Sequence, residues 1–225
     1  MDSGLGWFAG ATGIFGGSFN PPHHAHWRMA IEAREQAGLA RVDFYPVAVP
    51  PHKAGRSMLP FALRLVLAEA MIATHPGYAV SALEDEVDGP SYSYETLVRV
   101  RQACPQEHFV FIVGSTDFLT LPAWHRGLEL PLITDMIVVE RAGVDEAQSR
   151  AFAHQHWGAK ECASQVLQIP GGGRIALLTM PRLDISASLV RAKFVQGFDI
   201  RGLVPEAVHA WMQANRATCL EYWTS

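Results

Sequence analysis

Short apolar runs recur along the chain, and many of their residues are β-branched or aromatic. Runs of this length and composition predict buried strands. They are apolar on both faces, so we expect a sheet that is covered on both sides. The predicted strands are residues 11–15, 42–49, 109–113, 136–139 and 175–179.

Segments with helical spacing of apolar residues lie among these runs and after them. The predicted helices are residues 25–36, 61–74, 94–104, 187–196 and 205–214. Alternating strands and helices predict an α/β fold on a parallel sheet with right-handed crossovers. Residues 145–173 fit neither pattern clearly, and no element is predicted there. No shift in composition demands a boundary, so residues 1–225 are expected to form one domain.

Composition narrows the class of protein. The net charge is −4, from 18 basic and 22 acidic residues, which argues against a general nucleic-acid binder. An anionic substrate is still compatible with this charge, because a local site can be positive in an acidic protein. The three cysteines are far apart in sequence, which favours a reducing compartment. We expect no signal peptide and no membrane helix, because the first residues lack a basic segment and apolar runs stay below ~18 residues. The chain is therefore expected to be cytoplasmic.

The strongest candidate for chemistry is GGSFNPPHHAH, residues 16–26, between the first predicted strand and the first predicted helix. Glycine lets the backbone approach an anion closely, and the N–H groups of a helix start point towards it. His23 and His26 are three residues apart, so in a first helical turn they share one face. From there an imidazole N–H could stabilise charge on a transferring phosphoryl group. The segment predicts phosphate binding.

Other interpretations of residues 16–26 stay open at this point. Glycine pairs after strands are common turn formers, and clustered histidines can bind a transition metal. The segment is neither the dinucleotide fingerprint GxGxxG nor the Walker A pattern. That weakens the hypothesis of a nicotinamide-dependent oxidoreductase.

The same segment resembles the GG[ST]F[DN]PxHxGH signature of nucleotidyltransferases with an HxGH motif, with Ala25 in place of its glycine. Four further blocks resemble the bacterial nicotinate-nucleotide adenylyltransferases. They are PPHK at residues 50–53, GPSYS at 89–93, Trp124, and ISASLVR at 185–191. In order and spacing the blocks cover the chain from about Thr12 to Trp211.

The resemblance implies a Rossmann-like fold: an open parallel sheet with helices on both faces and a small C-terminal helical part, from about residue 186, that completes the ATP site. It implies adenylyl transfer from ATP to nicotinate mononucleotide, giving the deamido dinucleotide and pyrophosphate, with Mg²⁺ accompanying ATP and no covalent enzyme intermediate. The expected partners are these small molecules, with no nucleic acid and no membrane; the oligomeric state stays open. Alternatives are nicotinamide mononucleotide, phosphopantetheine or another phosphorylated acceptor, and a nucleotide-binding protein without turnover.

The residues also suggest how ATP would bind. Ser186 is a plausible N-cap, and Ser188 and Arg191 follow in the next helical turn, which makes a second anion site. By resemblance this site takes the β- and γ-phosphates, and His23 and His26 are the catalytic pair. The full set of expected ATP-binding residues is Gly16, Gly17, Ser18, Phe19, Gly114, Thr116, Asp117, Ser186, Ser188 and Arg191.

The acceptor is expected to bind through a second set of residues. Ser91 or Ser93 is the candidate cap of helix 94–104, and a helix start favours a carboxylate over a neutral amide. By resemblance Ser93 faces the nicotinate carboxylate and Trp124 stacks on the pyridinium ring, an attraction of about 0.5–2 kcal/mol. No metal ligand is predicted from the protein itself. The expected acceptor-binding residues are His52, Lys53, Tyr92, Ser93, Trp124, His125 and Arg141.

One position departs from the family pattern. The family has Gly-x-Asp after the strand that corresponds to residues 109–113, whereas this chain has Gly114-Ser115-Thr116-Asp117. Thr116 therefore stands where the acid is expected, and Asp117 follows one residue later. Either a local shift brings Asp117 into place, which we favour, or the hydroxyl of Thr116 takes the role.

Overall fold

The computed structural model describes residues 3–50, 57–86, 89–141 and 143–224. Within it the chain divides into two compact units, each assembled from separate stretches of sequence. We call them the sheet unit and the histidine unit. The sheet unit is Met1–Gly16, Met29–Asp43 and Tyr92–Arg182, and the histidine unit is Gly17–Arg28, Phe44–Ser91 and Leu183–Ser225.

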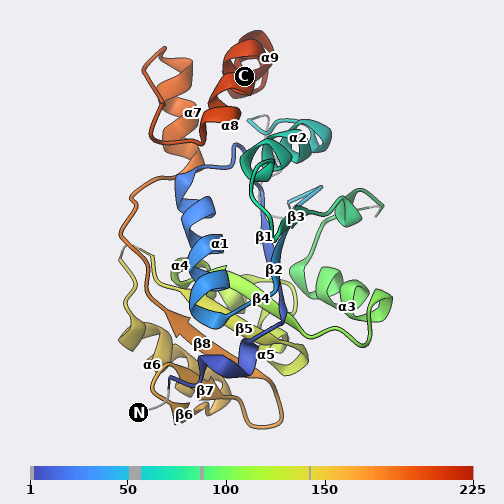
Figure 1. The fold of residues 1–225 in the computed structure, drawn as a ribbon, viewed down its shortest axis with the longest axis vertical. Coiled ribbons are helices and arrows are strands. Elements are labelled where there is room, and N and C mark those ends of the chain that lie inside the picture. The colour runs from blue at the N-terminus through green and yellow to red at the C-terminus, as the bar shows by residue number, and fades with distance from the viewer. Residues whose placement is uncertain (1–2, 51–56, 87–88, 142, 225) are drawn as a thin grey trace. The chain divides into compact units, whose positions relative to one another are not determined.

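The strands form one eight-stranded sheet with the order β3-β2-β1-β4-β5-β8-β7-β6 (Figure 1). The pairs β1–β4, β4–β5 and β5–β8 are parallel, whereas β8–β7 and β7–β6 are antiparallel. The expected parallel sheet is thus confirmed in its centre and carries an antiparallel extension at one edge. The strands are β1 Thr12–Gly17, β2 Arg41–Pro46, β3 Tyr78–Val80, β4 Phe109–Gly114, β5 Asp135–Val139, β6 Lys160–Ala163, β7 Val166–Gln168 and β8 Arg174–Leu178.

The central strands are buried on both faces, as their apolar sequences predict. All six residues of β4 are buried, and so are the last four residues of both β5 and β8. Because side chains alternate between the faces of a sheet, burial of every position requires cover on both sides. The expectation of a sheet with two covered faces is confirmed.

The second predicted strand, residues 42–49, is too long at its end. Strand β2 stops at Pro46. The N–H groups of Ala48 and Val49 both donate to the Ser91 side chain, at 3.1 and 3.2 Å, instead of continuing a ladder. A hydroxyl that accepts two backbone N–H groups thus ends the strand.

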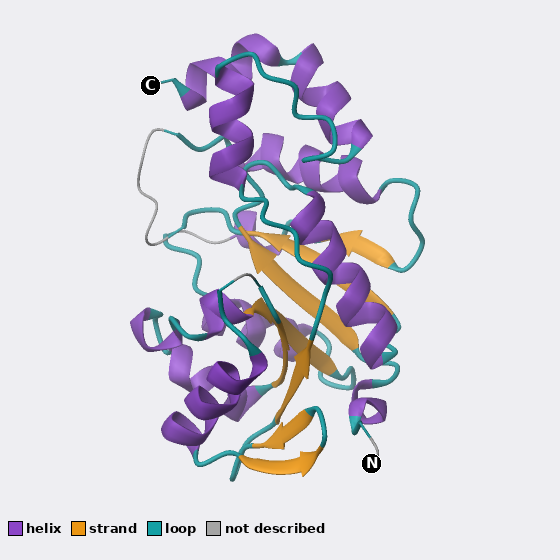
Figure 2. Cartoon of the chain, turned by 90° about the vertical axis from the view of Figure 1, so that its left-hand side faces the viewer, coloured by secondary structure: helices purple, strands orange, loops and turns teal. Residues whose placement is uncertain are grey.

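The five predicted helices are present, with ends that shift by up to two residues. They are α1 His24–Ala37, α2 Phe61–Ile72, α3 Ser93–Ala103, α7 Ala187–Val195 and α8 Glu206–Ala214. In the histidine unit α2 packs beside α8, and a further helix, α9 Arg216–Trp223, packs on α7 and α8 (Figure 2). No helix in the described ranges has the length and apolar character needed to cross a membrane.

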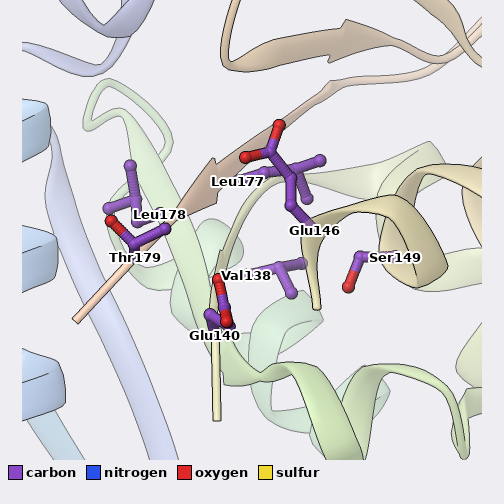
Figure 3. Close-up of a pocket in the computed structure, with 7 residues that line it drawn as sticks. All are labelled: Val138, Glu140, Glu146, Ser149, Leu177, Leu178 and Thr179. Atoms are coloured by element: carbon purple, nitrogen blue, oxygen red, sulfur yellow. The ribbon is translucent and has the colours of Figure 1, made fainter. Parts of the chain in front are cut away.

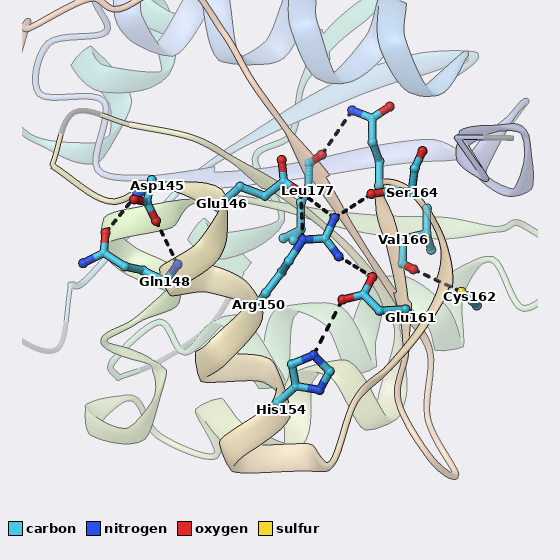
Figure 4. Close-up of polar contacts among 11 residues, drawn as sticks. Asp145, Glu146, Gln148, Arg150, His154, Glu161, Cys162, Ser164, Val166 and Leu177 are labelled. Atoms are coloured by element: carbon cyan, nitrogen blue, oxygen red, sulfur yellow. Dashed lines mark hydrogen bonds and ion pairs between the residues drawn. The ribbon is translucent and has the colours of Figure 1, made fainter. Parts of the chain in front are cut away.

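Residues 145–173, where the sequence gives no clear period, hold helix α6, Glu146–Trp157, and the strands β6 and β7. A capping box begins α6: Asp145 accepts from the Gln148 N–H at 2.9 Å, and the Gln148 side chain accepts from the Asp145 N–H at 3.0 Å. Arg150 pairs with Glu146 of the same helix, and it joins α6 to the β6–β7 hairpin through Glu161 and the Ser164 carbonyl (Figure 4). The Asp-x-x-Gln spacing was the signal for this helix start.

Short helical turns complete the sheet unit, and one of them, α4 (Ser115–Phe118), carries the predicted site residues Thr116 and Asp117. The turns are η1 Leu5–Phe8, α4 Ser115–Phe118, η3 Leu121–Ala123, η4 Gly127–Glu129 and α5 Leu130–Ile133. The histidine unit has one more, η2 Leu83–Glu86. Apolar periodicity cannot reveal elements of three or four residues, because they are shorter than one period of the pattern.

The cap of α6 gives a test of this part of the fold. We expect Asp145→Ala to lower the free energy of unfolding by about 1 kcal/mol, because the Gln148 N–H loses its acceptor. Urea or thermal unfolding measures the change. Gln155→Ala, at an exposed position of the same helix, is the control and should stay within about 0.5 kcal/mol of the native chain. Equal stability of the two variants would contradict the role of the cap.

Candidate nucleotidyl-transfer site

The turn between β1 and α1, residues 17–23, begins at a glycine whose position has no room for a side chain. Phe19 lies in the left-handed region, with φ of 44°, and its ring is buried. A Cβ on Gly17 would stand 2.9 Å from that ring, closer than carbon atoms pack. Gly17 is therefore required for space, since the Phe19 ring folds back over its Cα. We call residues 17–23 the phosphate turn, because they lead into the N-terminus of α1.

His23 and His26 stand face to face at this helix start. Their ring centroids are 3.7 Å apart and the rings are nearly parallel, at 19°. Phe19 contacts His26 edge-on, with centroids 5.1 Å apart, and His23 is 2% exposed. The predicted shared face is confirmed, and the packing allows each ring little freedom to rotate.

His24, between them, has a different environment. Its backbone N–H donates to the Leu203 carbonyl at 3.0 Å, and a hydrogen bond links its side chain to the Val204 backbone. Burial lowers the pKa of His24, and the bond to Val204 offsets part of that effect. His24 therefore ties the start of α1 to residues 203–204, while His23 and His26 form the stacked pair.

The second anion motif reaches the phosphate turn directly. Ser186 is the N-cap of α7, as predicted, and accepts from the Leu189 N–H at 3.2 Å. Arg191 donates to the Ser188 hydroxyl at 3.1 Å and to the Asn20 carbonyl at 2.9 Å. A bond across 171 positions of sequence thus joins α7 to the turn that carries the histidines.

This arrangement concentrates positive potential. The N-termini of α1 and α7 each present a partial positive charge, and Arg191 adds a full one. Burial lowers the pKa of Arg191, yet the guanidinium remains charged at neutral pH. Histidine N–H, serine hydroxyl and guanidinium groups in one unit are the donors that polyphosphates require.

The sheet unit holds the predicted acceptor residues. Ser93 is the first residue of α3, and Tyr92 precedes it at the cap position without a side-chain cap. The expected cap by Ser91 or Ser93 is wrong, because the Ser91 hydroxyl is engaged with residues 48 and 49. Tyr92 packs against His125 with ring centroids 4.3 Å apart, so the start of α3 meets the segment that follows η3.

Trp124 and its neighbours form a tightly built turn. The indole N–H of Trp124 donates to the Thr120 hydroxyl at 3.2 Å, and the ring is partly exposed. A Cβ on Gly127 would lie 2.1 Å from the Leu121 carbonyl oxygen and 2.8 Å from the Trp124 Cβ. The position of Trp124 therefore depends on a glycine three residues later.

Arg126 fixes the far side of that turn. Its φ is 52°, in the left-handed region, and its guanidinium donates to the Tyr94 hydroxyl at 2.8 Å. It also pairs with both carboxylate oxygens of Glu129, at 3.0 and 2.6 Å. The bonds to Glu129 raise the pKa of Arg126 and lower that of Glu129. The sequence did not single out Arg126.

The end of β4 is joined to Arg141. A Cβ on Gly114 would lie 2.8 Å from the Arg141 side chain, so Arg141 passes over this glycine. The hydroxyl of Ser115 accepts from the Arg141 N–H at 2.9 Å and donates to the Val144 carbonyl at 3.2 Å. The two predicted positions Gly114 and Arg141 are thus brought together, with Ser115 between them.

Thr116 and Asp117 both lie exposed on α4. The carbonyl of Asp117 accepts from the Thr120 N–H and hydroxyl, which fixes the backbone after it. Which of the two serves the nucleotide stays a prediction. His52 and Lys53 fall outside the described residues.

A metal ion finds no ready ligand set in the described parts of the chain, where no group of three His, Cys, Asp or Glu side chains could hold one. A narrow pocket in the sheet unit is lined by β5, β8, α6 and adjoining residues (Figure 3). None of the predicted site residues lines it. Its lining residues are Val138, Glu140, Glu146, Ser149, Leu177, Leu178 and Thr179.

Sequence reasoning missed two polar residues that support the phosphate turn. Asn20 accepts from the Leu59 N–H at 3.1 Å and donates to the Ser57 carbonyl at 2.9 Å. Arg64 is 1% exposed and donates to the Ser18 carbonyl at 2.9 Å. A signal existed for Arg64: it stands in line with Leu67, Ala68 and Met71 on the buried stripe of α2, where a charge is rare.

Comparison with known proteins gives the family. The cytidylyltransferase-like family model matches residues 14–193. A protein from Geobacter metallireducens named probable nicotinate-nucleotide adenylyltransferase is 38% identical over 208 residues, covering 91% of this chain and 96% of the relative. One of the same name from Geobacillus thermodenitrificans is 32% identical over 204 residues, covering 91% and 84%.

Solved structures agree on the fold. The Plasmodium falciparum nicotinic acid mononucleotide adenylyltransferase complexed with NaAD has a TM-score of 0.71 at 19% identity, with 92% of this chain and 97% of that chain covered. The likeness in structure, at that identity, supports the Rossmann-like α/β fold. Since the sequence relatives are 32–38% identical and match 91% of this chain and 84–96% of their own length, the chain belongs to the cytidylyltransferase-like family and, within it, to the nicotinate-nucleotide adenylyltransferases.

Proposed function

We propose that this chain transfers the adenylyl group of ATP to nicotinate mononucleotide, releasing pyrophosphate and forming the deamido dinucleotide, a step of NAD biosynthesis. The bond from Arg191 to the Asn20 carbonyl carries the proposal. It brings the histidine pair and the α7 start into one set of phosphate-binding groups. The relatives bear the name of this activity.

The reaction needs a phosphate oxygen of the acceptor to attack the α-phosphorus of ATP, while the bond to the β-phosphate oxygen breaks. The attacking group is already an anion, so no general base is required. His23 and His26 would donate hydrogen bonds to the α- and β-phosphates, where charge develops. Arg191, Ser188 and the N-termini of α1 and α7 would stabilise the departing pyrophosphate.

The stacked imidazoles need no positive charge for this role. Their ring centroids lie 3.7 Å apart at the start of α1. A neutral imidazole still donates one N–H. The pair can therefore support phosphate binding without a net charge of two at the helix start.

The acceptor would bind through the residues of the sheet unit. The Trp124 ring offers a surface for a pyridinium, and the start of α3 at Ser93 favours the nicotinate carboxylate. Arg141 supplies a charge for the acceptor phosphate. Tyr92 and His125 support the ring contact, as their packing indicates. His52 and Lys53 stay predicted contacts, and so do Gly16, Gly114, Thr116 and Asp117 on the ATP side.

We infer that Mg²⁺ accompanies ATP. Mg²⁺ commonly keeps several waters and binds through substrate phosphates with one or two carboxylates. The described residues hold no group of three potential ligands, so the ion would depend on the triphosphate for most of its ligands. The protein's part is to bind and orient the phosphates.

We keep two further proposals about the whole chain. Residues 1–225 act as one nucleotidyltransferase domain, because the family match over residues 14–193 runs through both compact units. The reaction takes place in the cytoplasm, since all three cysteines are free and a reducing compartment keeps them so.

The acceptor can be tested by pyrophosphate release. With ATP and Mg²⁺, we expect turnover on nicotinate mononucleotide at a kcat/KM at least about tenfold above that on nicotinamide mononucleotide, because a helix N-terminus favours the carboxylate. Turnover on another phosphorylated acceptor but not on nicotinate mononucleotide would refute the substrate assignment.

The histidine pair can be tested by truncation. His26→Ala is expected to lower kcat by a factor of about 10² or more, because it removes a donor from the phosphates in the transition state. His154→Ala is the matched control, since that histidine is exposed on α6 beside Glu161. Near-native kcat in His26→Ala would contradict the mechanism.

The turn that holds Trp124 can be tested through Gly127. Gly127→Ala forces its Cβ into the Leu121 carbonyl and the Trp124 Cβ, so the indole must shift. We expect KM for nicotinate mononucleotide to rise about fivefold or more, with the Kd of a non-hydrolysable ATP analogue within about twofold of native. Gly6→Ala, where a Cβ meets no atom within 4 Å, is the control. An unchanged acceptor KM would argue against Trp124 as the ring platform.

A further inference from the structure

Arg64 is a buried cation whose hydrogen-bond partners, among the residues that the structure describes, are backbone carbonyl oxygens. Its side chain is 1% exposed, and its guanidinium donates to four carbonyls. The acceptors are Ser18 at 2.9 Å, Val47 at 2.7 Å, Ala48 at 3.0 Å and Leu59 at 2.9 Å. These carbonyls come from three segments of the histidine unit, so one side chain joins three stretches of backbone.

The bond to Ser18 fixes a peptide plane in the phosphate turn. In a trans peptide the carbonyl and the following N–H point in opposite directions. With the Ser18 carbonyl directed at Arg64, the Phe19 N–H must point the other way. The left-handed backbone of Phe19 and the ring over Gly17 depend on the same peptide orientation.

The bonds to Val47 and Ala48 fix the segment that follows β2. The N–H groups of Ala48 and Val49 donate to the Ser91 hydroxyl, while the carbonyls of Val47 and Ala48 accept from Arg64. Residues 47–49 are therefore held on both sides, by an arginine and by a serine.

The bond to Leu59 fixes the other end of the same connection. The Leu59 carbonyl accepts from Arg64 at 2.9 Å, and its N–H donates to the Asn20 side chain at 3.1 Å. Asn20 itself belongs to the phosphate turn, and its carbonyl accepts from Arg191. Residues 47–49, residue 59 and the phosphate turn thus form one hydrogen-bonded unit around Arg64.

We propose that Arg64 is a positioning residue for adenylyl transfer. It holds the phosphate turn in its phosphate-binding conformation and fixes the position of the turn relative to residues 47–49 and 59. The inference rests on the proposed function, since it deepens the account of the same site. Arg64 acts through the backbone that binds the nucleotide, not by touching the reacting atoms.

The chemistry of the side chain explains why arginine stands here. Four carbonyls in different directions match the planar fork of a guanidinium, whereas an ammonium has three donors on one atom. Burial lowers the pKa of Arg64 to about 10, so the group still carries its charge at neutral pH. A buried charge is tolerated when each donor finds an oxygen, as here.

The test compares two buried substitutions in α2. Arg64→Lys keeps the charge and loses the fork. Leu67→Ala removes a side chain that is 0% exposed on the same stripe and leaves the four carbonyls bound. For each variant we would measure the melting temperature, the Kd of a non-hydrolysable ATP analogue by calorimetry, and kcat and KM for ATP, all at a temperature where the variant is folded.

We expect Arg64→Lys to raise the Kd of the analogue about tenfold or more and to lower kcat/KM for ATP at least as much, because a misplaced phosphate turn loses aligned donors. Leu67→Ala should lower the melting temperature at least as far while both constants stay within about twofold of native. Native-like binding and turnover in Arg64→Lys, or equal losses in Leu67→Ala, would overturn the proposal.

Two provisions keep the test decisive. If Arg64→Lys fails to fold, Arg64→Gln decides, because a neutral amide fits the same site with fewer donors and leaves part of the carbonyl cluster without its partner. A loss of ATP-analogue affinity of about threefold or more supports the proposal, and native affinity overturns it. If the native chain binds the analogue but does not turn over nicotinate mononucleotide, the proposed acceptor fails, while the Kd comparison still tests Arg64.

Discussion

The backbone of the phosphate turn depends on arginines that bind its carbonyl oxygens. Arg64 donates to the Ser18 carbonyl from α2, and Arg191 donates to the Asn20 carbonyl from α7. A turn that presents N–H groups to an anion must point its carbonyls elsewhere, and carbonyls without donors would be costly to bury. Guanidinium groups meet both needs of such a turn. They donate hydrogen bonds to the buried carbonyls, which keeps these oxygens turned away from the anion, and they add positive charge behind the N–H groups.

This arrangement also explains the packing around the histidines. Phe19 needs a left-handed backbone to fold its ring over Gly17, and from there the ring contacts both His26 and Phe44. His26 in turn stacks on His23. Ala25, which replaces the glycine of the family signature, is 1% exposed, so its position admits only a small side chain. Steric fit, rather than hydrogen bonding alone, thus sets the directions of the rings.

Residues 121–129 of the sheet unit, which carry the proposed acceptor residues Trp124 and His125, are held in place by different contacts. Here a turn from Leu121 to Glu129 is compressed by Gly127 and stabilised by the pairing of Arg126 with Glu129 and Tyr94. The left-handed φ of Arg126 costs conformational energy that its three hydrogen bonds offset. In both units, therefore, an arginine with several partners holds a strained turn that carries residues of the proposed site.

The sequence by itself determined the central strands, the helices α1, α2, α3, α7 and α8, and the family resemblance carried by residues 16–26 and 185–191. These features are local: the spacing of apolar residues, a helix cap such as Ser186, and the spacing of His23 and His26. A strand or helix has a fixed repeat, so each of them can be recognised in the sequence alone. Residues 145–173 stayed unassigned because short strands and a weakly apolar helix leave no period, although the capping box at Asp145 was present.

Only the tertiary structure decided what the isolated polar residues do. Nothing in the sequence near Arg64, Asn20 or Ser91 tells which carbonyl or N–H each one binds, since their partners lie up to 46 residues away. The contact between Arg191 and Asn20 likewise joins residues 171 positions apart in the sequence. A hydrogen bond depends on distances of about 3 Å, and such distances between remote segments exist only once the chain has packed.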